Sequence, residues 1–188
     1  MYIRFPARAR LAELSEKPRY NGGMDLSVWL TNFRELHERA RRRLHTSDER
    51  ALYLEAREQL ARSLLAAQGQ NLQPGSTARR SFRVPKGMHV DVSFRTGAVR
   101  SRTLDISSGG FSCLMGGAPT EGTLSGFALW LPGQDEAPVV GRARIVAATP
   151  PSEQGNQRVS FIFENVSDDD HERLEMLIFD LALGYIVA

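Results

Sequence analysis

The fold is decided by the stretch from His89 to Phe111, which reads HVDVSFRTGAVRSRTLDISSGGF. Apolar and polar residues alternate twice in it: first at Val90, Val92 and Phe94, and again from Val99 to Asp105 around two arginines. A period of two is typical of a strand that buries one face and exposes the other. The stretch therefore predicts neighbouring strands of an antiparallel sheet.

The same pattern continues toward the C-terminus, interrupted by turns rich in Gly and Pro. Further strands are expected over residues 111–115, 124–131, 139–147 and 158–163. Ser167 followed by three aspartates predicts a helix start, because acidic side chains are favourable at the positive end of a helix dipole. The buried stripe of that helix would be Leu174, Leu177, Ile178 and Leu181. Short strands plus one closing helix indicate an antiparallel barrel or sandwich.

Upstream of the strands, residues 24–68 show a helical period and predict two helices packed as an antiparallel hairpin. A Thr46-x-x-Glu49 capping box marks the start of the second helix. The expected apolar stripes are Leu26, Leu30, Phe33, Leu36, Ala40 and Leu44 on the first helix, and Leu52, Ala56, Leu60 and Leu64, widened by Tyr53 and Leu65, on the second. A short helix over residues 3–16 is also expected.

Residues 68–78 (QGQNLQPGSTA) have almost no apolar content and predict a linker. The chain would then consist of a helical region with its linker, residues 1–75, and a strand-rich domain, residues 76–188. We expect an α+β fold in which the two parts have different roles.

Charge is unevenly distributed over the 188 residues, although the formal net charge is only +2. Residues 1–83 hold 16 basic and 9 acidic side chains, whereas residues 84–188 hold 8 basic and 13 acidic ones. This asymmetry indicates an anionic partner for the front half.

Several classes of protein are disfavoured by composition. No apolar run is long enough for a transmembrane helix, and the charged N-terminus is unlike a signal peptide, so a cytoplasmic protein without membrane contact is expected. A single cysteine, Cys113, and four scattered histidines support neither a disulfide nor a metal site. Because no catalytic constellation or nucleotide-binding glycine motif occurs, the sequence predicts no enzyme and no cofactor.

Two clusters carry chemistry. The first holds Arg79, Arg80 and Arg83 between the linker and the first strand. Guanidinium forks bind phosphates, recognise the O6/N7 edge of guanine and stack on bases; the alternative is a solvated basic linker. The second is Asp105-Ile106-Ser107-Ser108-Gly109-Gly110 between two strands. Its polar side chains and glycines suit either a ligand rim or an ordinary hairpin turn.

The two clusters together, Arg79-x-x-x-Arg83 and, 22 residues after Arg83, Asp105-x-Ser107-x-x-Gly110, resemble the motif pair of the PilZ domain family. The resemblance spans about residues 76–188 and implies a six-stranded antiparallel β-barrel with a helix at its end. It also implies binding of cyclic di-GMP, the bacterial second messenger.

The resemblance assigns a role to each motif residue. Arg79 and Arg83 would hold phosphates and guanine edges of the ligand, with Arg80 as an extra phosphate or stacking contact. Asp105 and Ser107 would hydrogen-bond a guanine. Gly110 would keep the turn open for the ligand.

The leading hypothesis is therefore a non-enzymatic cyclic di-GMP receptor that relays binding to a partner or to its own helical region. A protein partner, or a homo-oligomer formed through the N-terminal helices, is expected. Two alternatives stay open. The apolar stripes of the helix pair would suit an interaction or oligomerisation module that binds no nucleotide, and the basic Arg41-Arg42-Arg43 run would suit a DNA-binding protein.

Overall fold

The computed structural model describes residues 25–69, 80–117, 120–133 and 137–187. The chain forms two compact units, which divide between Phe82 and Arg83. The predicted helix over residues 3–16 and nearly all of the predicted linker lie outside the described residues.

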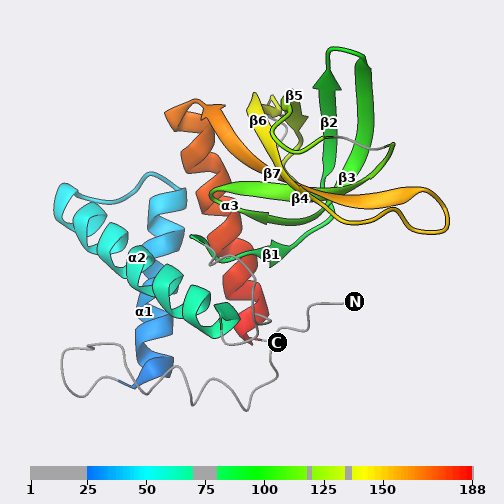
Figure 1. The fold of residues 1–188 in the computed structure, drawn as a ribbon. Helices are drawn as coiled ribbons and strands as arrows, with labels where there is room; N and C mark the ends of the chain where they lie inside the picture. The colour runs from blue at the N-terminus through cyan, green and yellow to red at the C-terminus, as the bar shows by residue number, and fades with distance from the viewer. Residues whose placement is uncertain (1–24, 70–79, 118–119, 134–136, 188) are drawn as a thin grey trace. The chain divides into compact units, whose positions relative to one another are not determined.

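The N-terminal unit contains the two expected helices, α1 (Leu26–Arg41) and α2 (Ser47–Gly69) (Figure 1). Asp25 caps the start of helix α1, and its carboxylate accepts a hydrogen bond from the backbone N–H of Ser27. The predicted capping box at the start of α2 is confirmed. The Thr46 N–H donates to Glu49 Oε2 at 2.8 Å, and the Glu49 N–H donates to Thr46 Oγ1 at 3.3 Å. This reciprocal pair satisfies two backbone donors that a helix start leaves open.

The helices pack through an aromatic cluster. Phe33, His37 and Tyr53 are buried, and His37 Nδ1 lies 2.8 Å from the Tyr53 hydroxyl. The predicted stripes are wrong at their ends, because Leu44 and Leu52 are 63% and 55% exposed. Leu44 follows the end of α1, and α2 turns Tyr53, rather than its neighbour Leu52, into the buried face.

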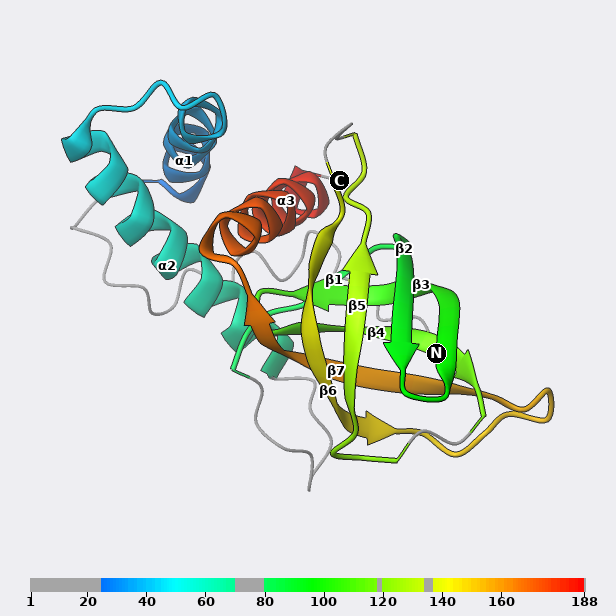
Figure 2. The same ribbon diagram turned by 90° about the horizontal axis from the view of Figure 1, so that it is seen from above.

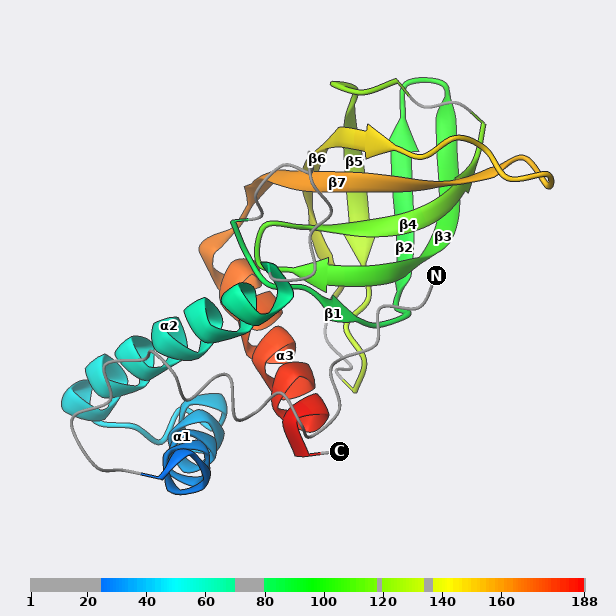
Figure 3. The same cartoon turned by 60° about the horizontal axis from the view of Figure 1, so that its bottom comes forward.

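The second unit contains a closed six-stranded antiparallel barrel, which confirms the predicted fold (Figures 1 and 3). Its strands pair in the order β3-β2-β5-β6-β7-β4, and β4 pairs again with β3 to close the ring. Two residues, β1 (Val84–Pro85), add to the outer edge of β3. The barrel strands are β2 (His89–Phe94), β3 (Gly97–Ser107), β4 (Gly110–Gly116), β5 (Leu124–Leu129), β6 (Val139–Ala148) and β7 (Asn156–Val166).

The alternation seen in the sequence fills the barrel. Val90, Val92 and Ile106 are fully buried, and Phe111 stacks on Phe161 with ring centroids 4.8 Å apart. Helix α3 (Asp168–Val187) contacts β1, β3 and β6 and lies beside one end of the barrel (Figure 2). Its start is capped by Ser167, whose hydroxyl accepts from the Asp170 N–H at 3.2 Å, as the sequence predicted. Among the described residues, no helix combines the length and apolarity needed to cross a bilayer.

Cys113 lies inside this core, and its burial raises the pKa of the thiol from 9.0 to about 11. The unfolded chain releases this proton near pH 9, but the folded chain holds it until about pH 11. The free energy of unfolding should therefore fall as pH rises through this window. Urea denaturation at pH 8 and pH 10.5 should show a larger loss for the wild type than for Cys113→Ala. Equal losses in both proteins would contradict a buried, neutral thiol.

Candidate functional site

A β-bulge in β3 decides which way the motif aspartate points. Thr103 pairs with Cys113 of β4, but the next pair is Asp105 with Ser112, so Leu104 is an extra residue on β3. A bulge of this kind shifts the alternation of the strand by one residue. Thr103 stays with the core side, and Asp105 shares the outer wall with Ser112.

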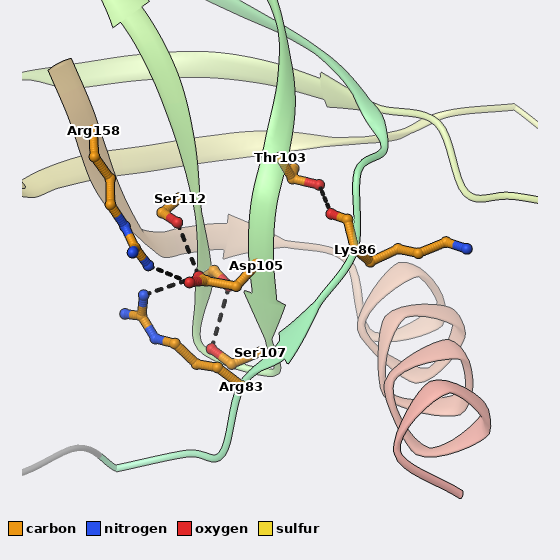
Figure 4. A network of polar contacts seen from close by, with 8 residues as sticks. Arg83, Lys86, Thr103, Asp105, Ser107, Ser112 and Arg158 are labelled. Carbon is orange, nitrogen blue, oxygen red and sulfur yellow. Dashed lines mark hydrogen bonds and ion pairs between the residues drawn. The ribbon is translucent and has the colours of Figure 1, made fainter. Parts of the chain in front are cut away.

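Asp105 is nevertheless only 3% exposed, because other side chains cover it. Its carboxylate accepts hydrogen bonds from Arg83 Nη1 at 3.1 Å and from Ser112 Oγ at 3.0 Å, and it also pairs with Arg158 (Figure 4). Burying a carboxylate is costly unless hydrogen bonds and opposite charges replace its water contacts. Two guanidinium groups and one hydroxyl supply them.

These partners come from distant parts of the chain. Pairing of β1 with β3 sets Val84 opposite Ile106 and Pro85 opposite Asp105. Arg83 immediately precedes this short strand, so its side chain lies within reach of the carboxylate. Arg158 lies on β7, 53 residues from Asp105, and reaches it because β7 pairs with β4. The site is thus a small polar cluster on the outer wall, where β3, β4 and β7 meet.

The rest of the Asp105–Gly110 motif forms a tight hairpin turn between β3 and β4. Ser107 is 2% exposed, and its hydroxyl donates to the carbonyl of Gly110 at 3.2 Å. A Cβ on Gly110 would lie 2.0 Å from the backbone oxygen of Phe161 on β7. Gly110 is therefore required for close approach of two strands, whatever else it does. This geometry is that of an ordinary hairpin turn, which the sequence of the motif also suits.

Of the six residues selected from the sequence, the structure brings four together in the second unit: Arg83, Asp105, Ser107 and Gly110. Arg80 is exposed and belongs to the N-terminal unit. Arg79 lies outside the described residues.

Two residues outside both sequence motifs, Ser112 and Arg158, contact the Asp105 carboxylate. Ser112 follows a core phenylalanine, so the alternation of the strand places its side chain on the outer wall. Only the bulge shows that the Asp105 side chain lies on the same wall. Arg158 has no local signal at all, since its proximity to Asp105 depends on strand pairing.

The cluster offers two kinds of recognition chemistry. The carboxylate can accept the two N–H groups on the Watson–Crick edge of a guanine, and the guanidinium forks can donate to phosphate oxygens or to guanine O6 and N7. Among the described residues, no group of three or more His, Cys, Asp or Glu side chains could hold a metal ion.

Solved structures are similar to this chain at low sequence identity. The inhibitor of motility MotI/DgrA of Bacillus subtilis matches with a TM-score of 0.51 and 14% identity over 58% of this chain and 53% of its own. The K. pneumonia MrkH–c-di-GMP complex matches with a TM-score of 0.49 and 16% identity over 60% of this chain and 56% of its own. The chain thus spans about half the length of either protein.

An isolated domain is also similar. The PilZ domain of YcgR from Escherichia coli, solved with c-di-GMP, matches with a TM-score of 0.45 and 21% identity over 56% of this chain and 92% of its own. No curated protein matches the chain.

The family comparison covers more than half of the sequence. The PilZ domain model matches residues 77–180, a range that contains both motifs, all of the barrel and most of α3. Together with the closed six-stranded barrel and the helix at its end, this match shows that the chain belongs to the PilZ domain family.

Proposed function

We propose that this chain is a non-enzymatic receptor for cyclic di-GMP that binds the ligand at the Asp105 cluster. The observation that carries the proposal is the buried carboxylate of Asp105, held between Arg83 and Arg158 on the barrel's outer wall. Membership of the PilZ family supports the same conclusion. The ligand has two phosphates and two guanines, which match guanidinium forks and a carboxylate respectively.

Each residue has a part in the proposed complex. Asp105 and Ser107 hydrogen-bond a guanine, while Arg79 and Arg83 hold phosphates and guanine edges and Arg80 adds a phosphate or stacking contact. Gly110 keeps the turn open for the ligand. These roles extend the family's motif chemistry to the positions that match it.

We expect Arg83 and Arg158 to have different roles at Asp105 when the ligand binds. Arg83 is the first residue of the second unit, and its guanidinium donates a hydrogen bond to the Asp105 carboxylate. A phosphate competes for that guanidinium, whereas Arg158, anchored on β7, keeps the carboxylate oriented for guanine. Ligand binding would then replace the Arg83–Asp105 contact, which lies next to the boundary of the two units in the sequence. That change is the proposed relay to the helical region or to a partner.

Isothermal titration calorimetry with cyclic di-GMP tests the proposal. We expect saturable binding to the purified full chain, and no comparable heat from 5′-GMP or cyclic GMP, which lack the second guanine. A dissociation constant of about 1 μM corresponds to a binding free energy of about −8 kcal/mol. A flat titration at a protein concentration about 100 times that dissociation constant would exclude the receptor function.

A second candidate is favoured by the surface of the helix pair. Val28, Leu44, Leu52 and Leu54 are each at least 41% exposed, so the N-terminal unit carries apolar side chains suited to a protein contact. Light scattering with and without nucleotide separates the candidates. An oligomer that is indifferent to cyclic di-GMP supports an interaction module, whereas a ligand-dependent change supports the receptor.

The DNA-binding alternative relies on the arginines at the end of α1. Arg41 and Arg42 both pair with Glu38, and Arg39 pairs with Glu49. Their charges are thus partly compensated within the unit. Titration with duplex DNA at low salt tests this alternative, since binding through phosphates weakens steeply with added salt.

A further inference from the structure

The short strand that follows Arg83 is held from two sides. Strand β1 consists only of Val84 and Pro85, and Arg83 directly precedes it. A strand of two residues makes few hydrogen bonds with its neighbour, so its position depends strongly on each contact. Whatever fixes β1 also fixes the backbone from which the Arg83 guanidinium reaches Asp105.

One peptide group, between Pro85 and Lys86, carries both contacts. Its N–H donates to the carbonyl of Leu104 on β3 at 3.3 Å. In a planar trans peptide group the carbonyl and the N–H point in opposite directions. The Pro85 carbonyl therefore faces away from β3. Because proline has no N–H, this carbonyl is the only main-chain polar group that Pro85 has.

Helix α3 supplies the partner of that carbonyl. The hydroxyl of Tyr185, in the last turn of α3, donates to the carbonyl of Pro85 at 2.8 Å. The two residues are 100 positions apart in the chain. Since Val84 is fully buried, β1 is held by its core side chain, by β3 and by the end of α3.

The chain after β1 has a separate attachment to β3. The Thr103 hydroxyl donates to the carbonyl of Lys86 and accepts from the Met88 N–H at 3.0 Å (Figure 4). The Thr103 N–H donates in turn to the carbonyl of Met88 at 2.9 Å. Loss of the Tyr185 contact should therefore leave residues 86–88 in place and loosen only β1 and Arg83 before it.

We propose that Tyr185 is a positioning residue for cyclic di-GMP binding, a role that rests on the proposed receptor function. Pro85 lies opposite Asp105 on β3. Because side chains alternate along an extended chain, Arg83 and Pro85 lie on the same side. Holding the Pro85 carbonyl keeps the Arg83 guanidinium at the rim of the Asp105 cluster. Less conformational freedom is then lost when the ligand binds.

Calorimetric titration of Tyr185→Phe with cyclic di-GMP tests this role. The variant keeps the ring but loses the hydroxyl, and we expect about two- to tenfold weaker binding, the effect of one neutral hydrogen bond. The matched control is Ser125→Ala, which removes a hydroxyl that donates to the carbonyl of Ala143 at 3.2 Å between β5 and β6. It should bind like the wild type.

The titrations separate this role from the receptor function itself. A flat titration of the wild type would remove the receptor function, and with it any role of Tyr185 in binding. Normal binding by both the wild type and Tyr185→Phe would overturn the positioning role alone.

A double-mutant cycle shows whether Tyr185 acts through Arg83. In the Arg83→Ala background, Tyr185→Phe should cause no further loss of affinity, because the guanidinium that the hydroxyl positions is gone. A purely structural role would weaken binding equally in both backgrounds, and that result would contradict the proposal.

Hydrogen exchange in the absence of ligand tests the contact directly. The Lys86 amide belongs to the peptide group that Tyr185 holds, so it should exchange faster in Tyr185→Phe than in the wild type or in Ser125→Ala. Unchanged exchange at Lys86 would show that the Tyr185 hydroxyl does not hold β1, and would overturn the proposal even if affinity fell.

Discussion

Replacing Arg83 by alanine is expected to weaken cyclic di-GMP binding about ten- to hundredfold, the effect of losing a charge-assisted contact of about 1.5–3 kcal/mol. Arg83 Nη1 lies 3.1 Å from Asp105 Oδ1, and the Arg83 side chain is 23% exposed, so the guanidinium stands at the rim of the site. Asp105 keeps Ser112 and Arg158 as partners in the variant. The fold should therefore survive, and calorimetric titration can report on the ligand alone.

Two comparison variants sharpen this result. Arg83→Lys keeps the charge but loses the planar fork, so an intermediate affinity is expected if bidentate contact matters. Arg144→Ala removes an arginine that also pairs with a carboxylate on the outer wall, but outside the Asp105 cluster, and should bind normally. Unchanged binding by Arg83→Ala, with normal binding by the wild type, would refute this site while leaving the receptor function standing.

Gly110→Ala is expected to destabilise the barrel by about 3 kcal/mol, at the upper end of the cost of overpacking. The added Cβ would lie 2.0 Å from the oxygen and 2.9 Å from the carbonyl carbon of Phe161. Both atoms are backbone, and Phe161 is itself a core residue, so the neighbouring strand cannot move aside cheaply. Strands β4 and β7 must separate where they pair. Thermal and urea denaturation measure the loss.

Gly116→Ala is the matched control. Gly116 lies on the same strand, and a Cβ added there would come no nearer than 3.9 Å to the side chain of Asn156. It should melt close to the wild type. The pair also separates two roles for Gly110. If this glycine served only to admit ligand, Gly110→Ala would fold normally and lose affinity alone, which would contradict the structural role inferred from the packing.

Local chemistry made several elements predictable from sequence. The Thr46–Glu49 capping box and the Ser167 cap are completed by residues within three positions, so the sequence contains all the atoms involved. The alternation at Val90 and Val92 likewise predicts a buried strand face. Leu44 and Leu52 were predicted wrongly, because the rotation of one helix against another depends on packing rather than on a stripe read from one helix.

The residues of the candidate site were likewise predictable only in part from the sequence. Arg83, Asp105, Ser107 and Gly110 stand in two short motifs, and motif spacing alone grouped them. The tertiary structure added Ser112 and Arg158 and turned Asp105 to the outer wall through the extra residue Leu104. A bulge is a property of two paired strands, and nothing in β3 alone specifies which residue lacks a partner.

By itself, the sequence determined the type and order of the elements, the family motifs and the charge asymmetry, because each depends on residues close together in the chain. Only the tertiary structure decided what surrounds the Asp105 carboxylate. Those surroundings depend on strand register, which joins residues such as Asp105 and Arg158 across 53 positions and separates neighbours onto opposite faces.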